Sequence, residues 1–229
     1  NSDMVRGVSS ESVLMLTNKK KIKSVYFPAW VDNNIFITEN SSMDTNKKDI
    51  LFVGNIIPRK GVMFLLESFN TFSEENTESS FLLIGDAPNK KYFEECTKYV
   101  ESNDLQNRVK FLGKIEQDEI SNIMNRSRIL VLASSYEGLP RVLIEAGLCS
   151  LPSIAPNIDG ISYPFGEKGG TVTYELDNHE EYLKILNNFY KDNNYYSDLS
   201  RKAYNISNEL SGDGAFAENW SNLIEEVMK

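Results

Sequence analysis

The sequence predicts an α/β protein: a Rossmann-like parallel sheet with helices on both of its faces. Two observations predict this fold. From residue 49 onward, short apolar runs typical of buried strands alternate with segments of helical periodicity. Three of the apolar runs also end in glycine, which is typical of the turn after a strand. Sheets of this kind bind ligands beside the carboxyl ends of their strands, so we expect the functional site at that edge.

The predicted elements follow one another in a regular order. Strands are expected at residues 49–54, 80–85, 108–113, 128–133, 151–156 and 169–174. Helices are expected at residues 62–72, 90–102, 117–127 and 139–149, and over most of 178–228. Gly54, Gly85 and Gly113 close the first three strands, where the missing side chain would let a ligand approach the backbone. A purely structural role in ending those strands is an equal alternative.

Residues 1–48 do not follow this alternation. A short helix is expected within residues 8–16, and a strand running into a turn at residues 23–30, because the residue before a proline leaves helical geometry. Residues 39–48 are polar and rich in turn formers, which is typical of a linker. The sequence therefore divides into residues 1–48 and a domain at residues 49–229.

Charge and composition exclude several classes of function. The net charge of −9 and the pI of about 4.8 argue against nucleic acid as a partner, because phosphate backbones require a basic surface. The basic cluster at residues 18–23 is expected to be a solvated turn. No run approaches the roughly 20 apolar residues of a membrane span, and no signal peptide is recognisable. We therefore expect a cytoplasmic protein.

Cysteine and histidine give no signal of metal or nucleophilic chemistry. Cys96 and Cys149 lack the spacing of metal ligands and do not form a disulfide framework. His179, the single histidine, lies in a polar segment and is expected to be a surface residue. The sequence thus predicts no metal site.

A candidate anion site lies between the strand at 49–54 and the helix at 62–72. Gly61 opens the helix, and Arg59 and Lys60 stand just before it. Free backbone N–H groups at a helix N-terminus, together with two cations, suit a phosphate group. Neither the GxxxxGK[ST] nor the GxGxxG phosphate-binding motif is present, and a solvated basic turn is the alternative.

The helix at 139–149 provides a second N-terminus at the same edge of the sheet. Pro140 fits the first helical turn, so Gly138 and Leu139 are expected to present unbonded N–H groups. Two helix N-termini that face one crevice suit a diphosphate better than a single phosphate.

Two glutamates frame this helix. Glu137 precedes it, and Glu145 lies about 9 Å along its axis, too far for the two carboxylates to share a proton. The pair suits an extended ligand with hydroxyl groups at both ends, because a carboxylate accepts two hydrogen bonds well. Arg141 and Glu145 could instead form a plain i,i+4 ion pair. The helix is otherwise apolar on every side, however, and a buried carboxylate needs a partner or a ligand.

These segments resemble the C-terminal half of the family-4, or group 1, retaining glycosyltransferases. The resemblance covers about residues 8–228, and its most specific part is the E-x7-E motif from Glu137 to Glu145. The segments that carry it are ILFVGNIIPRKG, FLLIGDAP, VKFLG and SSYEGLPRVLIEAGLCSLPSIAPNIDGI. It implies a GT-B fold, in which two Rossmann-like domains face each other across a cleft and the C-terminal one binds a nucleotide-sugar donor.

The resemblance also implies roles for individual residues. Glu137 would hold hydroxyls of the donor sugar, and Lys60 and Arg59 would neutralise the diphosphate; these three form the predicted catalytic group. Glu145 would hold the ribose. The predicted donor-binding residues are Gly54, Asn55, Gly85, Lys114, Ile115, Gly138, Leu139, Pro140 and Glu145, with Lys114 and Ile115 beside the base. Transfer would retain the anomeric configuration without a metal or other cofactor.

Two departures from the family pattern shape the expectation. Asn55 stands where many members have arginine, and Arg59 could take over that phosphate contact. Residues 1–48 resemble only the tail of the acceptor-binding domain, so we expect a fragment that binds the donor but transfers poorly. A UDP-sugar donor is the default, for transfer to a glycan or lipid-linked acceptor in polysaccharide biosynthesis by a full-length protein at the inner face of the membrane. The alternatives are another GT-B enzyme, such as a nucleotide-sugar epimerase, and a non-catalytic Rossmann-like binding module.

Overall fold

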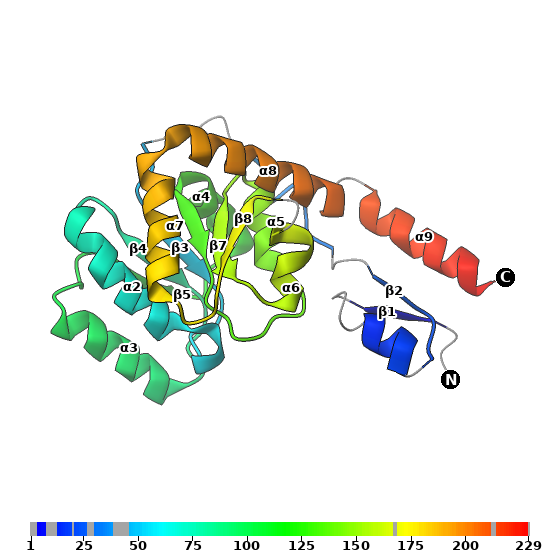
Figure 1. Ribbon diagram of the computed structural model, residues 1–229, viewed down its shortest axis with the longest axis horizontal. Coiled ribbons are helices and arrows are strands. Elements are labelled where there is room, and N and C mark those ends of the chain that lie inside the picture. The colour runs from blue at the N-terminus through cyan, green and yellow to red at the C-terminus, as the bar shows by residue number, and fades with distance from the viewer. Residues whose placement is uncertain are drawn as a thin grey trace.

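The computed structural model describes residues 4–7, 13–19, 21–26, 30–38, 46–166, 169–211 and 214–228 (Figure 1). Its main part is a six-stranded parallel sheet with strand order β5-β4-β3-β6-β7-β8. The strands are β3 (Ile50–Val53), β4 (Phe81–Ile84), β5 (Val109–Gly113), β6 (Ile129–Val131), β7 (Ser153–Pro156) and β8 (Thr171–Tyr174). The predicted α/β fold is confirmed, and each predicted strand contains an observed one.

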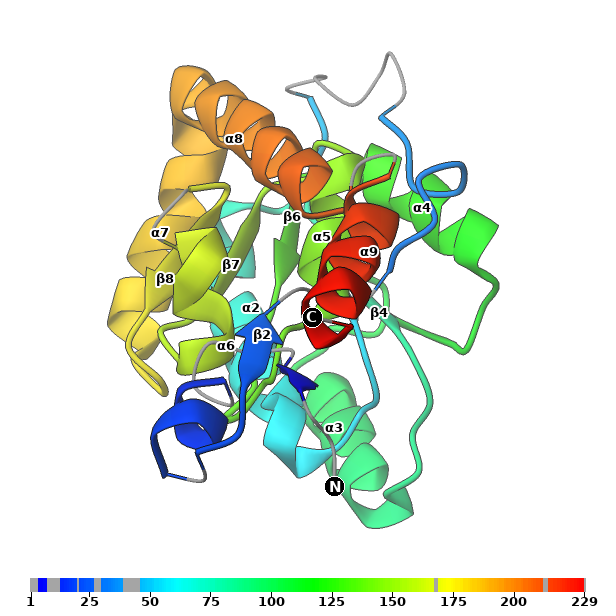
Figure 2. The same cartoon turned by 90° about the vertical axis from the view of Figure 1, so that its right-hand side faces the viewer.

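Helices cover both faces of this sheet (Figures 1 and 2). The long helices are α2 (Val62–Glu75), α3 (Lys90–Ser102), α4 (Gln117–Arg126), α5 (Arg141–Leu148), α7 (His179–Lys191), α8 (Asn193–Ser211) and α9 (Ala215–Val227). Helix α2 packs against α3 and α7, whereas α5 packs against α4 and α8. Three short helical segments, which the sequence did not predict, are η2 (Pro58–Lys60), α6 (Asp159–Ile161) and η3 (Ser162–Gly166).

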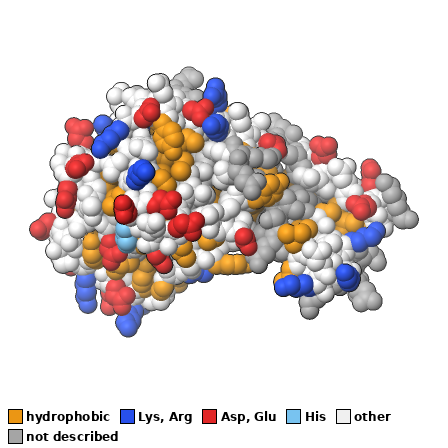
Figure 3. Space-filling model, in the orientation of Figure 1, with side chains coloured by type: hydrophobic (Ala, Val, Ile, Leu, Met, Phe, Trp, Pro, Cys, Tyr) orange, Lys and Arg blue, Asp and Glu red, His pale blue; other side chains and the backbone are white. Residues whose placement is uncertain are grey.

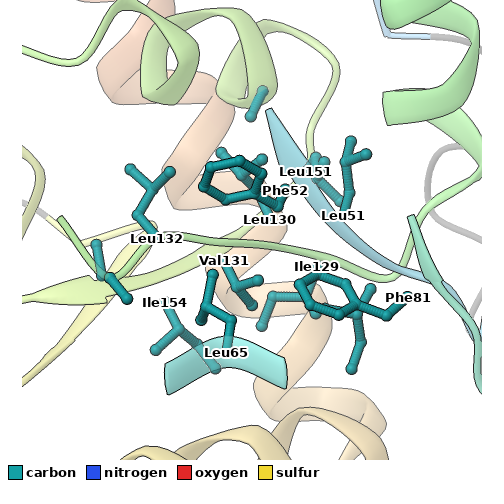
Figure 4. Close-up of a cluster of buried hydrophobic side chains, with 14 of the residues drawn as sticks. Leu51, Phe52, Leu65, Phe81, Ile129, Leu130, Val131, Leu132, Leu151 and Ile154 are labelled. Carbon is teal, nitrogen blue, oxygen red and sulfur yellow. The ribbon is translucent and has the colours of Figure 1, made fainter. Parts of the chain in front are cut away.

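The core lies on both sides of the central strands, and β6 shows this directly. Ile129 and Val131 lie on the side of Leu65 from α2, whereas Leu130 and Leu132 lie on the opposite side (Figure 4). All five side chains are at most 1% exposed. A strand buried on both faces has no polar side, which explains its uninterrupted apolar sequence.

The strand order reverses between β3 and β6. The chain runs outward from β3 through β4 to β5, and then returns to place β6 on the other side of β3. Ile50 of β3 thus pairs with Phe81 on one side and with Ile129 on the other. In open α/β sheets, ligands bind in the crevice outside the carboxyl ends of strands at such a reversal. A ligand is therefore expected beside the segments that follow β3 and β6.

A second, two-stranded parallel sheet pairs β1 (Val5–Gly7) with β2 (Ser24–Tyr26). Strand β2 falls within the predicted strand at 23–30, whereas β1 was not predicted. Residues 13–19 are helical and include the π-helix η1 (Met15–Lys19), which confirms residues 13–16 of the predicted helix at 8–16 and extends it by three residues. The remaining residues of these predictions, 8–12 and 27–29, and residues 39–45 of the predicted linker lie outside the described residues.

The segment at residues 30–38 packs onto the six-stranded domain. Val31 and Phe36 belong to its buried core. The hydroxyl of Thr38 donates to the carbonyl of Leu148 at 2.7 Å and also lies 2.7 Å from the hydroxyl of Ser150. This segment is thereby joined to the C-terminal end of α5. The division of the chain at residues 48 and 49 stays a prediction.

His179 lies at the surface, as the sequence predicted, with a side chain that is 42% exposed. One side of its ring also packs against α2, with its centroid 4.1 Å from that of Phe64 and its Nδ1 atom 2.8 Å from the hydroxyl of Ser68. It begins helix α7 and joins it to α2, which is a packing role. Cys96 and Cys149 are buried, and neither forms a disulfide with another described residue.

The surface carries both signs of charge. On the face shown in Figure 3, acidic and basic side chains are scattered among one another. Within the described part of the chain, no helix is both long enough and apolar enough to span a membrane.

Candidate functional site

The turn between β3 and α2 is fastened to the end of β6. Gly61 caps α2 in the left-handed conformation with φ of 63°. A Cβ atom on Gly61 would lie 2.2 Å from the carbonyl oxygen of Ala133, so only glycine allows this close approach. The N–H of Ser135 donates to the carbonyl of Arg59 at 2.9 Å. The residues before α2 and those after β6 therefore pack together and form one wall of the crevice at the strand reversal.

Two cations and a carboxylate meet at this wall. The ammonium of Lys60 donates a hydrogen bond to Oε1 of Glu137. The guanidinium of Arg59 donates to the carbonyl of Tyr136 and lies 3.8 Å from Oε1 of Glu137. The side chains of Lys60 and Glu137 are only 17% and 10% exposed, whereas that of Arg59 is 44% exposed. The structure thus brings the three predicted catalytic residues together, and charge-assisted hydrogen bonds are strong in such a partly desolvated place.

Helix α5 begins later than the sequence predicted. Its first residue is Arg141, and Pro140 is the N-cap, with extended backbone angles of φ −72° and ψ 107°. Pro140 accepts a hydrogen bond from the N–H of Leu143 at 3.0 Å. Gly138 and Leu139 consequently lie in the loop before the helix. Their N–H groups donate to no other described residue, so they are available to an anion.

Glu145 lies one turn into α5, apart from the Lys60–Glu137 contact. Its side chain is only 13% exposed, and Oε1 lies 3.5 Å from a terminal nitrogen of Arg141. Burial raises the pKa of the Glu145 carboxyl, and the positive charge of Arg141 partly offsets this effect. The i,i+4 ion pair that the sequence left as an alternative is therefore present, but it does not cancel the cost of burying the charge.

A cleft of about 390 Å³ opens beside Glu137. Tyr136, Glu137, Ile158 and Asp159 line it. Its second wall comes from the segment after β7, which is held close because a Cβ atom on Gly160 would lie 2.2 Å from the carbonyl oxygen of Glu137. The sequence prediction missed this wall. The Asp-Gly pair just beyond a predicted strand, at the carboxyl-end edge of the sheet, was the available signal.

The other predicted donor-binding residues follow the ends of neighbouring strands. Gly54 and Asn55 follow β3, and Gly85 follows β4. Lys114 and Ile115 follow β5, the edge strand, two strands away from β3. Lys114 is exposed, while Ile115 packs against the core. The predicted contact of these two residues with a base stays a prediction.

No cluster suited to a metal ion is found in the described part of the chain. Specifically, no three or more His, Cys, Asp or Glu side chains there come close enough together to hold one.

Comparison with protein families gives one match over most of the chain. The family model for group 1 glycosyl transferases matches residues 34–206.

Curated relatives are similar over long stretches. An uncharacterized glycosyltransferase of Methanocaldococcus jannaschii is 28% identical over 192 residues, which cover 82% of this chain and 51% of the relative. The N-acetyl-alpha-D-glucosaminyl L-malate synthase of Bacillus anthracis is 27% identical over 173 residues, which cover 70% of this chain and 43% of that protein. This chain therefore spans about half the length of the relatives that it matches.

Solved structures share the fold. Sucrose-phosphate synthase from Thermosynechococcus elongatus matches with a TM-score of 0.85 at 20% identity, over 100% of this chain and 59% of that one. Anabaena HepE in complex with UDP-glucose matches with a TM-score of 0.83 at 18% identity, over 98% of this chain and 64% of that one. The C-terminal domain of a Francisella tularensis protein, LpcC, matches with a TM-score of 0.67 at 20% identity, over 77% of this chain and 95% of that domain.

Proposed function

Because this chain belongs to the group 1 glycosyltransferases and has the fold of their C-terminal domains, we propose that it binds the nucleotide-sugar donor of a retaining hexosyl transfer. The donor would lie across the strand reversal between β3 and β6. Its diphosphate would face Lys60 and Arg59, and its sugar would enter the cleft beside Glu137. UDP is the favoured nucleotide, since the Anabaena relative of the same fold has been solved with UDP-glucose.

The contact between Lys60 and Glu137 carries this proposal. It joins the β3–α2 turn to the β6–α5 loop, and each partner suits a different part of one ligand. A cation at the start of a helix attracts phosphate. A carboxylate beside a cleft accepts hydrogen bonds from sugar hydroxyls. The bond between sugar and diphosphate would then lie near the point where the two side chains meet.

The remaining predicted residues would contact other parts of the same donor. Glu145 would accept hydrogen bonds from the ribose hydroxyls, which would repay part of the cost of burying its charge. The N–H groups of Gly138 and Leu139 would contact the diphosphate oxygens. Lys114 and Ile115 would lie beside the base, and Gly54, Asn55, Gly85 and Pro140 would shape the backbone around the donor.

The proposed chemistry is electrostatic. In the transfer, the bond between the anomeric carbon and the diphosphate oxygen would break, and its electron pair would leave with the diphosphate. The oxygen of an acceptor hydroxyl would bond to the anomeric carbon and release its proton to the departing diphosphate or to solvent. Lys60, Arg59 and the loop N–H groups would stabilise the negative charge that develops there. Glu137 would hold the sugar and orient its anomeric carbon. No metal ion is needed for these roles.

The acceptor is proposed to bind elsewhere in a longer protein. Since the relatives are about twice as long as the matched region, an acceptor domain would contribute the other wall of the active site. We therefore expect the 229-residue chain to bind donor and to show little transfer alone. The acceptor itself would be a glycan or a lipid-linked molecule.

Calorimetric titration tests the proposal directly. The chain is titrated with UDP, GDP and their sugars, with and without EDTA. We expect one nucleotide to bind in the presence of EDTA, and Lys60→Ala and Glu145→Ala to weaken that binding strongly. Failure of every nucleotide to bind would contradict the proposal and favour a non-catalytic module. Efficient sugar epimerisation by the chain would favour the other class of GT-B enzyme.

A further inference from the structure

We propose that Asp159 makes the sugar end of the cleft selective for uncharged sugars and disfavours donors whose sugar carries a carboxylate. The inference rests on the proposed function, and it adds a specificity-determining residue that lies outside the E-x7-E motif.

The position of Asp159 is fixed by close backbone packing. It is the first residue of α6 and lines the cleft together with Glu137 and Tyr136. The next residue, Gly160, is packed so tightly that an added Cβ would lie 2.2 Å from the carbonyl oxygen of Glu137 and 2.4 Å from that of Gly138. Asp159 and Glu137 therefore line the same cleft from two segments whose backbones are in close contact.

The two carboxylates differ in whether a nearby positive charge balances their negative charge. Oε1 of Glu137 contacts Lys60 and lies 3.8 Å from Arg59. Asp159 is exposed, and among the described residues none forms an ion pair or a hydrogen bond with its carboxylate. The positive charges thus stand on the β3 side of the cleft, and an uncompensated negative charge stands on the β7 side.

This arrangement orients the donor and restricts its sugar. The diphosphate is attracted to the side of Lys60 and Arg59, which leaves the sugar between Glu137 and Asp159. Sugar hydroxyls can donate hydrogen bonds to a carboxylate that has no other partner. A uronate would bring a second negative charge beside Asp159, and like charges placed together oppose binding. Tyr136, which is 62% exposed and also lines the cleft, carries no charge and is not expected to discriminate between the two types of sugar.

The test compares two donors that differ only in this charge. Dissociation constants are measured by calorimetry for UDP, UDP-glucose and UDP-glucuronate at low ionic strength. We expect the wild-type chain to bind UDP-glucose about tenfold more tightly than UDP-glucuronate, since an exposed charge is partly screened. Asp159→Asn should reduce this ratio to near one, with the affinity for UDP unchanged. If GDP binds in place of UDP, GDP-mannose and GDP-mannuronate form the matching pair.

Asp104→Asn is the matched control, because it removes the same charge from an exposed position in the turn between α3 and β5, at the opposite edge of the sheet from the cleft. It should leave the ratio at its wild-type value, and thermal melting verifies that both variants are folded. A ratio that is the same in the wild type and in Asp159→Asn would overturn the inference while leaving the proposed function standing. Absence of nucleotide binding by the wild type would overturn the proposed function, and the inference with it.

Discussion

The ammonium of Lys60 contacts the carboxylate of Glu137, although 77 positions separate the two residues in the chain. Each belongs to a turn that follows a different strand, and β3 and β6 are the neighbours between which the strand order reverses. The contact therefore marks the crevice where the fold places a ligand.

Removing the charge of Lys60 should weaken diphosphate binding. Lys60→Gln keeps a group that can donate to Glu137 but removes the cation. We expect a loss of about 1.5 to 3 kcal/mol, or roughly ten- to hundredfold in the dissociation constant for UDP, as measured by calorimetry. Lys184→Ala, at an exposed position on α7, is the control and should bind UDP normally. Equal affinities in Lys60→Gln and wild type would show that the diphosphate lies elsewhere.

Glu145 should lower the stability of the unliganded chain. Burial raises the pKa of this carboxyl, so the folded state holds its proton to higher pH than the unfolded state does. Its contribution to stability therefore falls as the pH rises from the unfolded pKa of about 4.3 to the raised pKa of the folded state. Above the raised pKa, the carboxyl is fully ionised and its destabilising effect has reached its full size. Glu145→Gln should accordingly stabilise the unliganded protein at neutral pH, by up to about 1 kcal/mol, while weakening donor binding.

Urea titrations at several pH values measure this effect. The stability advantage of Glu145→Gln should shrink as the pH falls and disappear below the unfolded pKa. An advantage that does not change with pH would mean that the charge of Glu145 is not its cause.

Arg141 should set the pH at which the donor is lost. Its positive charge lowers the pKa of Glu145, so Arg141→Met should raise that pKa further. The proposed ribose contact requires ionised Glu145, and binding should weaken as the pH falls through its pKa. In the variant this loss should occur at higher pH. Titrations with UDP-glucose between about pH 5 and pH 8 measure it, since the sugar diphosphate itself stays ionised in this range.

Arg201→Met, on the exposed face of α8, is the control for that experiment. Its profile should match the wild type. If the profile of Arg141→Met also matches, Arg141 is a bystander of the ribose site.

Gly160 should be required for the second wall of the cleft. Gly160→Ala would place a Cβ within 2.4 Å of two backbone carbonyl oxygens, so the segment after β7 must move away from Glu137. We expect a destabilisation of about 1 to 3 kcal/mol, together with weaker binding of the sugar donor. Gly166→Ala is the matched control, because its nearest contact would be a side-chain methyl of Thr173 at 3.2 Å. Thermal melting measures the stability of both variants, and calorimetry measures their affinity for the sugar donor. Equal effects of the two substitutions would contradict a special role for Gly160.

Much of the fold could be predicted because its signals are local. Strands buried on both faces give continuous apolar runs, and amphipathic helices give a 3.6-residue period. The order of the six strands could not be predicted in this way, since it depends on which strands pair. Strand β1, from Val5 to Gly7, contains Arg6 and belongs to no continuous apolar run, so it gives no strand pattern.

The candidate site was predictable on one side only. Arg59, Lys60 and Glu137 stand in recognisable turns beside helices, and the structure brings them together. Asp159 lies in a three-residue helix without periodicity, and it reaches the cleft only because β7 pairs with β6. The start of α5 was placed too early because proline is favoured in the first helical turn, whereas Pro140 keeps an extended backbone as the N-cap and the helix begins after it.

The pairing of β3 has a consequence for the order of folding. Ile50 meets Phe81 on one side and Ile129 on the other, and closing a longer loop costs more entropy and takes more time. The flank made of β3, β4 and β5 can therefore assemble before β6 and β7 arrive. During refolding, backbone circular dichroism should begin to recover before donor binding does. On a ribosome, Lys60 would emerge well ahead of the carboxylate that it contacts.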